Sequence, residues 1–325
     1  MMKKLVLACL LLAFVVVVLG AYTRLSDAGL GCPDWPGCYG TMLVPTKTEA
    51  IEAAESAFPE RPFEEGKAWK EMIHRYFAGA LGLFILAIAI MSVKANHSQP
   101  RKLPFFLLAL VTFQAALGMW TVTMNLMPVV VMGHLLGGFS VFSLLFLLYL
   151  RLHSFHIMGG DYPAKRFAKY AAIGIAVLVG QIALGGWTSA NYAALACTQL
   201  PICEGDWVQR LDFADAFSVP EANDYEFGTH SYEGRMTMHI MHRLGAIITF
   251  VYLLWLGVQL YGKVASQMIK NQALVMMVLL FVQVALGISN VVFKLPITVA
   301  VMHNAVAALL LLSLVLINYT LYKKT

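Results

Sequence analysis

The chain has 325 residues, of which 59% are hydrophobic and only 13% are charged. This composition excludes an ordinary soluble domain, in which charged residues make up about a quarter of the chain, and it predicts a membrane protein. The net charge of +5 does not indicate nucleic-acid binding, because the basic residues are scattered over short loops and do not gather on one face.

Eight apolar stretches are long enough to cross a bilayer as helices, which takes about 20 residues each. They cover residues 5–22, 72–93, 103–124, 129–150, 168–189, 240–261, 272–292 and 297–321. We interpret the first stretch as a membrane span. The alternative, a signal peptide cut at Cys9, would leave almost no apolar region before the cleavage site. The sequence therefore predicts an all-α polytopic membrane protein with eight transmembrane helices.

The loops predict the orientation of these helices. One set of loops carries lysines and arginines with Asp161 as its only acid, whereas the other acids lie in two long segments, about 25–70 and 190–238. Short cytoplasmic loops concentrate Lys and Arg. We therefore expect a bacterial inner-membrane protein with both termini in the cytoplasm and both long segments outside.

The sequence contains an internal repeat. Four landmarks occur twice with nearly constant spacing between their copies. They are a C-x5-C pair (Cys32/Cys38 and Cys197/Cys203), a His-Arg pair (His74-Arg75 and His242-Arg243), a Gln-to-Gly motif (Gln114–Gly118 and Gln283–Gly287) and a histidine that follows a proline (His134 and His303). The repeat predicts two tandem four-helix bundles, residues 1–155 and 156–325. An even number of helices per repeat inserts both halves in the same direction, which predicts a pseudo-twofold axis along the membrane normal.

Four histidines lie near the outer ends of predicted helices, two in each repeat: His74, His134, His242 and His303. Ionisable side chains inside spans usually face the bundle interior and serve a function. A single such histidine could simply bond a neighbouring helix, but two matched pairs favour a bound group. Structural zinc sites usually add cysteine or carboxylate ligands, whereas two axial imidazoles per half suit haem iron.

Charged residues next to these histidines extend the hypothesis. Arg75 and Arg243 could pair with haem propionates, whose carboxylates match a guanidinium, or could anchor their helices at the interface. Glu71 breaks the repeat, because His239 occupies the matching position. It lies three residues before His74 on one helical face. A carboxylate there could move protons or stabilise positive charge on a haem edge, or it could merely cap the helix.

The C-x5-C pairs, Cys32/Cys38 and Cys197/Cys203, fall in the outer segments, on the oxidising side, which favours disulfides. We expect the second pair to be a structural crosslink and leave a redox role open for the first. The remaining histidines have no predicted role; they are His97, His153, His156 and His230.

Taken together, the motifs resemble those of the haem A synthase family over essentially the whole chain. The resemblance is carried by both cysteine pairs and by four short motifs: Glu71-x-x-His74-Arg75, Gly133-His134, His242-Arg243 and His303-Asn304. It implies an enzyme that oxidises the C8 methyl group of haem O to the formyl group of haem A, the cofactor of terminal cytochrome oxidases.

The resemblance also implies roles for individual residues. His242 and His303 would ligate the iron of a resident haem b in the C-terminal half, and His74 and His134 would hold the iron of the substrate haem in the N-terminal half. Glu71 would be catalytic. The implied partners are haem O, haem O synthase and an electron acceptor or donor, and a homo-oligomer is compatible with this assignment.

Two other functions fit parts of the pattern. A di-haem b electron-transfer protein would explain both histidine pairs but would leave Glu71 unexplained. A secondary transporter built from parallel repeats would place its site near the bilayer midplane between broken helices, whereas these histidines cluster near the outer face.

Overall fold

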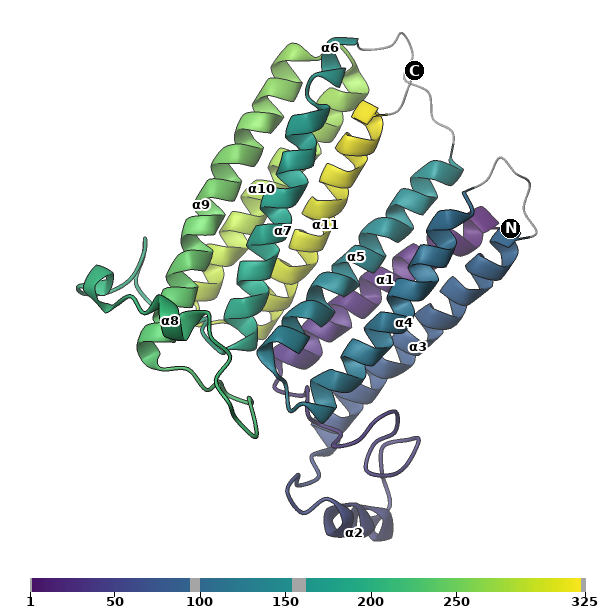
Figure 1. Cartoon of the computed structure of the whole chain (residues 1–325), viewed down its shortest axis with the longest axis vertical. Coiled ribbons are helices and arrows are strands. Elements are labelled where there is room, and N and C mark those ends of the chain that lie inside the picture. Colours follow the sequence, from purple (N-terminus) through teal and green to yellow (C-terminus); the bar gives the residue numbers. More distant parts are fainter. Residues whose placement is uncertain (1, 94–99, 154–161, 323–325) are drawn as a thin grey trace. The chain divides into compact units, whose positions relative to one another are not determined.

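The structure, a computed structural model, describes residues 2–93, 100–153 and 162–322. Over this part of the chain it is almost entirely helical (Figure 1). The helices are α1 (Met2–Leu25), α2 (Thr48–Ala57), α3 (Glu65–Val93), α4 (Lys102–Thr123), α5 (Pro128–Leu152), α6 (Tyr162–Lys165), α7 (Ala168–Ala190), α8 (Phe213–Ala216), α9 (Tyr232–Lys263), α10 (Gln267–Val292) and α11 (Ile297–Tyr322), with a 3-10 turn at Trp207–Arg210.

Eight helices in the described residues are long and apolar enough to cross a membrane: α1, α3, α4, α5, α7, α9, α10 and α11. This confirms the predicted all-α, eight-span fold class. Large apolar side chains such as Leu83, Phe106 and Ile248 are exposed on these helices. Because lipid can cover them, such exposure is the arrangement expected of a bilayer-embedded protein. The chain is a multi-pass membrane protein.

Two of the helices begin earlier than the apolar stretches suggested. The third helix in the chain, α3, starts at Glu65 and α9 starts at Tyr232, so each adds about two polar turns before its apolar part. Hydropathy detects only the part of a helix that lies in lipid, and these polar turns continue outside it. His74 and His242 consequently lie deeper in their helices than their predicted places near the helix ends, in the third turn or beyond.

The chain divides into two compact units, which we describe separately. The first unit comprises Met1–Phe142 and Val219–Thr229, and the second comprises Ser143–Ser218 and His230–Thr325. In the first unit α3 packs against α1 and α4, and in the second α7, α9, α10 and α11 pack together. The predicted boundary after residue 155, like His97, His156 and Asp161, lies outside the described residues. The two-fold axis stays a prediction.

Each unit makes a sharp turn before the helix that carries its last predicted histidine. Asn125 and Leu126 have φ values of 47° and 62°, and Lys294 and Leu295 have values of 56° and 62°. Non-glycine residues rarely adopt this left-handed conformation. The turns reverse the chain within a few residues, so His134 on α5 and His303 on α11 return beside α4 and α10.

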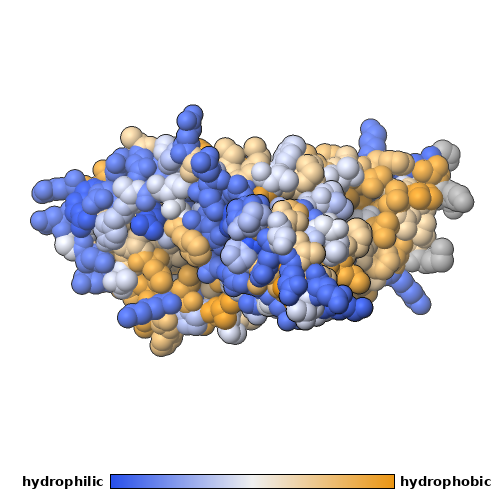
Figure 2. Space-filling view, turned by 90° about the horizontal axis from the view of Figure 1, so that it is seen from below, coloured by the Kyte–Doolittle hydropathy of each residue, from blue (hydrophilic) through white to orange (hydrophobic). Residues whose placement is uncertain are grey.

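The two long segments that were predicted to lie outside the membrane, which we call the outer segments, fold over one end of each unit. In the first unit α2 lies at the end opposite the start of α1, and in the second α8 lies at the end opposite α6 (Figure 1). A space-filling view of one face of the molecule shows hydrophilic side chains gathered among hydrophobic ones (Figure 2). A segment of the second outer loop, Val219–Thr229, belongs to the first unit; we call it the strap.

Candidate functional site

The first site is built around His74 on α3 and His134 on α5. The two rings lie with their centroids 6.5 Å apart and their planes perpendicular. A glycine makes room for each ring: a Cβ on Gly20 would lie 2.9 Å from His74 Cε1, and one on Gly118 would lie 3.4 Å from His134 Cε1. The Nδ1 atoms of both histidines are buried without a hydrogen-bond partner.

This geometry suits a metal ion held between two imidazoles. A bond between an imidazole nitrogen and a transition metal is about 2 Å long, so two rings on opposite sides of one ion have centroids roughly 6 Å apart. Leaving ring nitrogens buried and unpaired is costly unless a ligand satisfies them. The pair of His74 and His134 is therefore spaced so that the two imidazoles could hold one iron.

The second site repeats these features around His242 on α9 and His303 on α11. A Cβ on Gly185 would lie 2.9 Å from His242 Cε1, and one on Gly287 would lie 3.1 Å from His303 Cε1. Here glutamines contact both rings, with Gln181 Nε2 3.0 Å from His242 Nδ1 and Gln283 Nε2 3.2 Å from His303 Nε2. A metal-ligating histidine commonly uses its other ring nitrogen in such a bond.

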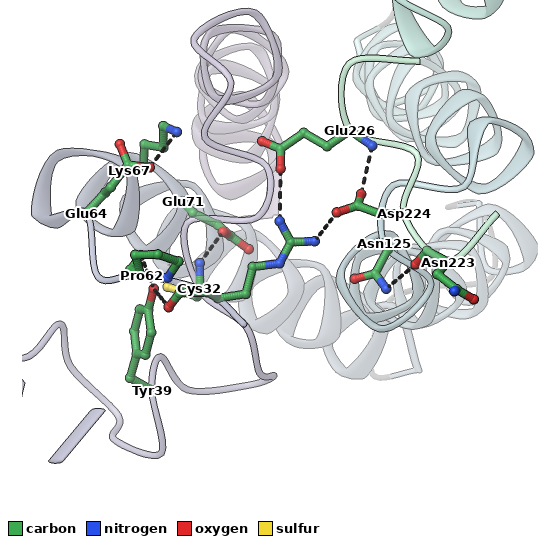
Figure 3. Close-up of polar contacts among 11 residues, drawn as sticks. Cys32, Tyr39, Pro62, Glu64, Lys67, Glu71, Asn125, Asn223, Asp224 and Glu226 are labelled. Carbon is green, nitrogen blue, oxygen red and sulfur yellow. Dashed lines mark hydrogen bonds and ion pairs between the residues drawn. The ribbon is translucent and has the colours of Figure 1, made fainter. Parts of the chain in front are cut away.

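Glu71 and His239 occupy equivalent places in the two sites. Glu71 Oε2 accepts a 2.9 Å hydrogen bond from the backbone N–H of Cys32, and its other oxygen pairs with Arg75 (Figure 3 shows the bond to Cys32). His239 contacts the N–H of Cys197 through Nδ1 at 3.3 Å and Arg243 through Nε2 at 3.2 Å. Both side chains are only 4% exposed. One place in the fold thus carries a carboxylate in the first site and an imidazole in the second.

The cysteines form the two predicted disulfides, Cys32–Cys38 and Cys197–Cys203. Each crosslink closes a small loop over one site. Glu204 lies close enough to the second pair to suggest a metal cluster, but the crosslink consumes the thiolates that such a cluster would need.

The two arginines hold these loops in place. Arg75 donates from Nη1 to the carbonyl of Asp34 at 2.8 Å, and Arg243 donates from Nη1 to the carbonyl of Gln199 at 2.7 Å. Arg243 also donates from Nη2 to the carbonyl of Cys197 at 2.7 Å. The sequence offered propionate binding or interfacial anchoring for these residues, and the structure gives them backbone carbonyls as partners. The sequence contains no pattern that would have identified backbone carbonyls as the partners of Arg75 and Arg243.

Sequence reasoning missed a polar network beside the first site. Arg61 pairs with Asp224 of the strap at 2.6 Å and with Glu226 at 2.9 Å, and Asn125 donates to the carbonyl of Asn223 at 2.8 Å (Figure 3). These bonds join the two long outer segments. They connect residues more than ninety positions apart, and no motif in the sequence marks them.

A pocket of about 210 Å³ lies between the strap and the first disulfide loop, lined in part by Gly31, Tyr39 and Glu226. Burial, and then the negative charge of Glu64, raises the pKa of Tyr39 above its usual value. The neutral hydroxyl donates to the carbonyls of Arg61 and Pro62, at 3.2 and 3.1 Å. Tyr39 therefore ties the disulfide loop to the segment that carries Arg61.

The remaining histidines with no predicted role lie apart from both sites where they are described. His153 contacts the carbonyl of Tyr149 at 2.9 Å, near the end of α5. His230 is buried and lies 2.9 Å from a carboxylate oxygen of Asp215, close to the start of α9.

Comparison with known proteins decides the family. Residues 3–315 match the model of the cytochrome oxidase assembly protein family. The chain belongs to this family. Among members of the cytochrome oxidase assembly protein family, a protein named Heme A synthase from Shewanella oneidensis is 55% identical over 318 residues, covering 97% of this chain and 95% of the relative. Relatives of the same name from Chelativorans sp. and Agrobacterium fabrum are 28% and 27% identical, each covering 92% of this chain and 84% of the relative.

Proposed function

We propose that this protein is a haem A synthase, which oxidises the C8 methyl group of haem O to the formyl group of haem A for terminal cytochrome oxidase. The family and the full-length relative at 55% identity support this activity. The observation that carries the assignment of the site is the difference between Glu71 and His239 on otherwise matched scaffolds. A protein with two equivalent electron-transfer sites would not need that difference.

Haem O is assigned to the first site, in the N-terminal half (1–155). His74 and His134 would hold the substrate iron, which the separation of their rings and their buried, unpaired Nδ1 atoms support. Glycines at positions 20 and 118 leave the space that the two rings occupy. Two protein ligands on one iron would restrict how the substrate sits relative to α3.

Haem b is assigned to the second site, in the C-terminal half (156–325), with His242 and His303 as its iron ligands. The glutamine contacts to both rings support this assignment, because they fix the orientation of the imidazoles. When bound, haem b supplies one-electron redox chemistry. Gln181 and Gln283 hold the rings, and Arg243 holds the loop that covers them.

Glu71 is assigned the catalytic role. Converting a methyl group and a water molecule to a formyl group releases four electrons and four protons, so the substrate edge needs a proton acceptor. Arg75 and the N–H of Cys32 hold the carboxyl group in place, and its position three residues before His74 puts it on the same face of α3 as that histidine. Positive charge that develops on the oxidised carbon would also be stabilised by this carboxylate.

The membrane placement and partners follow from the same proposal. Basic short loops and acidic long segments support a bacterial inner-membrane location with both termini in the cytoplasm and both sites near the outer face. The substrate is made by a haem O synthase, and the released electrons require an acceptor, so both are assigned as partners.

The test uses a bacterial host that makes haem O but no haem A. Wild type and Glu71→Gln would be expressed there, and extracted pigments would be identified by chromatography and mass spectrometry. We expect haem A from wild type and a loss of at least about a hundredfold in Glu71→Gln, with bound haem b retained. Glu64→Gln is the matched control, because Glu64 is a carboxylate of the same outer region that pairs with Lys67.

The outcomes separate the two leading functions. Haem A from wild type and Glu64→Gln but not from Glu71→Gln supports the synthase and the role of Glu71. A folded, haem-loaded wild type that makes no haem A would instead indicate a di-haem b electron-transfer protein. Full activity of Glu71→Gln would refute the catalytic role of this residue while leaving the synthase in place.

A further inference from the structure

Gln114 is a buried amide without a partner in the first unit. It lies on the membrane-spanning helix α4, is only 7% exposed, and neither its Nε2 nor its Oε1 has a hydrogen-bond partner. An amide buried in this way destabilises the fold, because desolvation of both polar groups is not compensated. A ligand that supplied both a donor and an acceptor would remove this penalty.

The neighbouring helix leaves room for this amide. A Cβ added to Gly137 of α5 would collide with the Nε2 of Gln114. In the second half the repeat places Val306 at the corresponding position, and the corresponding glutamine, Gln283, contacts the ring of His303. The same residue type therefore contacts a histidine in one half and remains unpaired beside a glycine in the other.

The amide lies deeper in the membrane than the substrate iron ligand. Gly118 of α4 packs against the ring of His134. Gln114 precedes Gly118 by about one helical turn on the same helix, and α4 runs outward to its end at Thr123, so the amide lies about 6 Å further from the outer end. It is placed at the level of the inward edge of a macrocycle bound between His74 and His134.

We propose that Gln114 is a specificity-determining residue that hydrogen-bonds the side-chain hydroxyl of haem O; this inference rests on the proposed function. Haem O carries a hydroxyl-bearing isoprenoid group where haem b carries a vinyl group. The charged propionates belong at the wet outer end, so the opposite edge of the macrocycle, which bears this group, faces inward toward Gln114. A hydroxyl both donates and accepts, which matches the two unpaired groups of a primary amide.

Such a contact selects haem O against the more abundant kind of haem that lacks the hydroxyl. A site built to bond a hydroxyl rejects the analogue without it, because the buried polar group is then left unpaired. Haem b would leave Gln114 in its uncompensated state, whereas haem O would satisfy it. For one neutral contact the expected discrimination is roughly tenfold to a hundredfold.

The test measures which haem the protein takes up. Purified full-length protein would be incubated with an equimolar mixture of haem O and haem b, freed of excess pigment, and extracted for chromatography, with the initial pigment content subtracted. The variants are Gln114→Met, which keeps the approximate shape, and Gly137→Val, which uses the residue of the second half and displaces the amide. Gln272→Leu is the control, since Gln272 donates to Thr320 elsewhere in the spans.

We expect the ratio of haem O to haem b taken up to fall about tenfold or more in both Gln114→Met and Gly137→Val and to stay at the wild-type value in Gln272→Leu. An unchanged ratio in Gln114→Met, with or without a changed absorption spectrum of the bound iron, would overturn the inference. If Gln114→Met does not fold, Gly137→Val decides by the same ratio. Haem A formation by wild type in the haem O host is measured in parallel, so failure of the proposed function would be recognised separately.

Discussion

The two sites share a scaffold and differ in a few side chains. In both sites a glycine lies against each histidine ring, and an arginine binds carbonyls of a loop closed by a disulfide. The first cysteine of that loop donates its backbone N–H to a residue three positions before a histidine. That acceptor is Glu71 in one site and His239 in the other. The comparison teaches that two disulfide loops can share one pattern of bonds while the acceptor at the matching position is a carboxyl group in one site and an imidazole in the other.

The largest expected effect comes from exchanging the two acceptors. In Glu71→His, the first site acquires the arrangement of the second, and we expect haem A formation to fall by about a hundredfold or more, since general acid–base groups contribute at least this much. His239→Glu places a carboxylate beside Arg243 and should leave the protein folded. Haem A per unit of protein in the haem O host measures both effects.

The double variant makes the comparison sharper. Glu71→His combined with His239→Glu should remain inactive, because the carboxylate then lies in the site assigned to resident haem b. Activity in the double variant would show that the two sites can exchange roles, which would contradict the assignment of haem O to the first site.

An intermediate effect is expected from replacing the glycines that lie against the histidine rings. An alanine methyl at position 20 would lie 2.9 Å from His74 Cε1, and one at position 185 would lie 2.9 Å from His242 Cε1. Overpacking costs about 1–3 kcal/mol, which corresponds to roughly fivefold to a hundredfold in haem affinity. Gly20→Ala should lower uptake of haem O, and Gly185→Ala should lower the content of haem b.

Pigment extraction from purified protein measures the two losses separately. Gly138→Ala on α5 and Gly180→Ala on α7 are the controls, because a methyl group at either position would meet nothing within 4 Å. Equal loss of both pigments from Gly20→Ala would argue against two separate sites with separate occupants.

The smallest effect concerns the start of α9, which is anchored differently from the start of α3. Asp215 accepts hydrogen bonds from Ser231 N at 3.0 Å and lies 2.9 Å from His230 Nδ1. Burial alone would raise the pKa of Asp215, but the bonds from Ser231 and His230 outweigh it and hold this pKa below its usual value. The stabilisation is present above the unfolded pKa of about 3.9 and is lost as the pH falls through the lower folded value.

Thermal unfolding of wild type and Asp215→Asn between pH 7 and pH 3 measures this contribution. We expect wild type to be slightly more stable at pH 7, by no more than about 1 kcal/mol, and the difference to shrink in acid. A difference that grew as the pH fell would contradict the assignment of an ionised carboxylate at this position.

Much of the fold could be predicted because a helix that crosses the lipid bilayer needs a minimum number of consecutive apolar residues. Every one of the eight helices corresponds to an apolar stretch of about 20 residues. The starts of α3 and α9 could not be predicted in this way. Their first turns are polar, and a hydropathy pattern marks only the apolar part of a helix. That Glu71 and His239 occupy matching places was predicted from the sequence, because the repeat pairs each residue of one half with a residue of the other.

The partners of these residues were beyond sequence reasoning. The bond from Cys32 to Glu71 depends on the path of a disulfide loop, and the pairing of Arg61 with the strap depends on a contact between distant segments. Gln114 was recognisable as a landmark of the repeat. That its amide is unpaired follows only from the placement of Gly137 and from the absence, in the described residues around it, of a bonding partner.

The strap has a consequence for how the protein is made. Residues Val219–Thr229 belong to the first unit, yet they are synthesised after α7 and before α9. The first four spans can enter the membrane long before this segment leaves the ribosome. The ion pairs of Arg61 with Asp224 and Glu226 can therefore form only after this segment has been made, so the first unit reaches its final form after its own four spans and α7 have been synthesised.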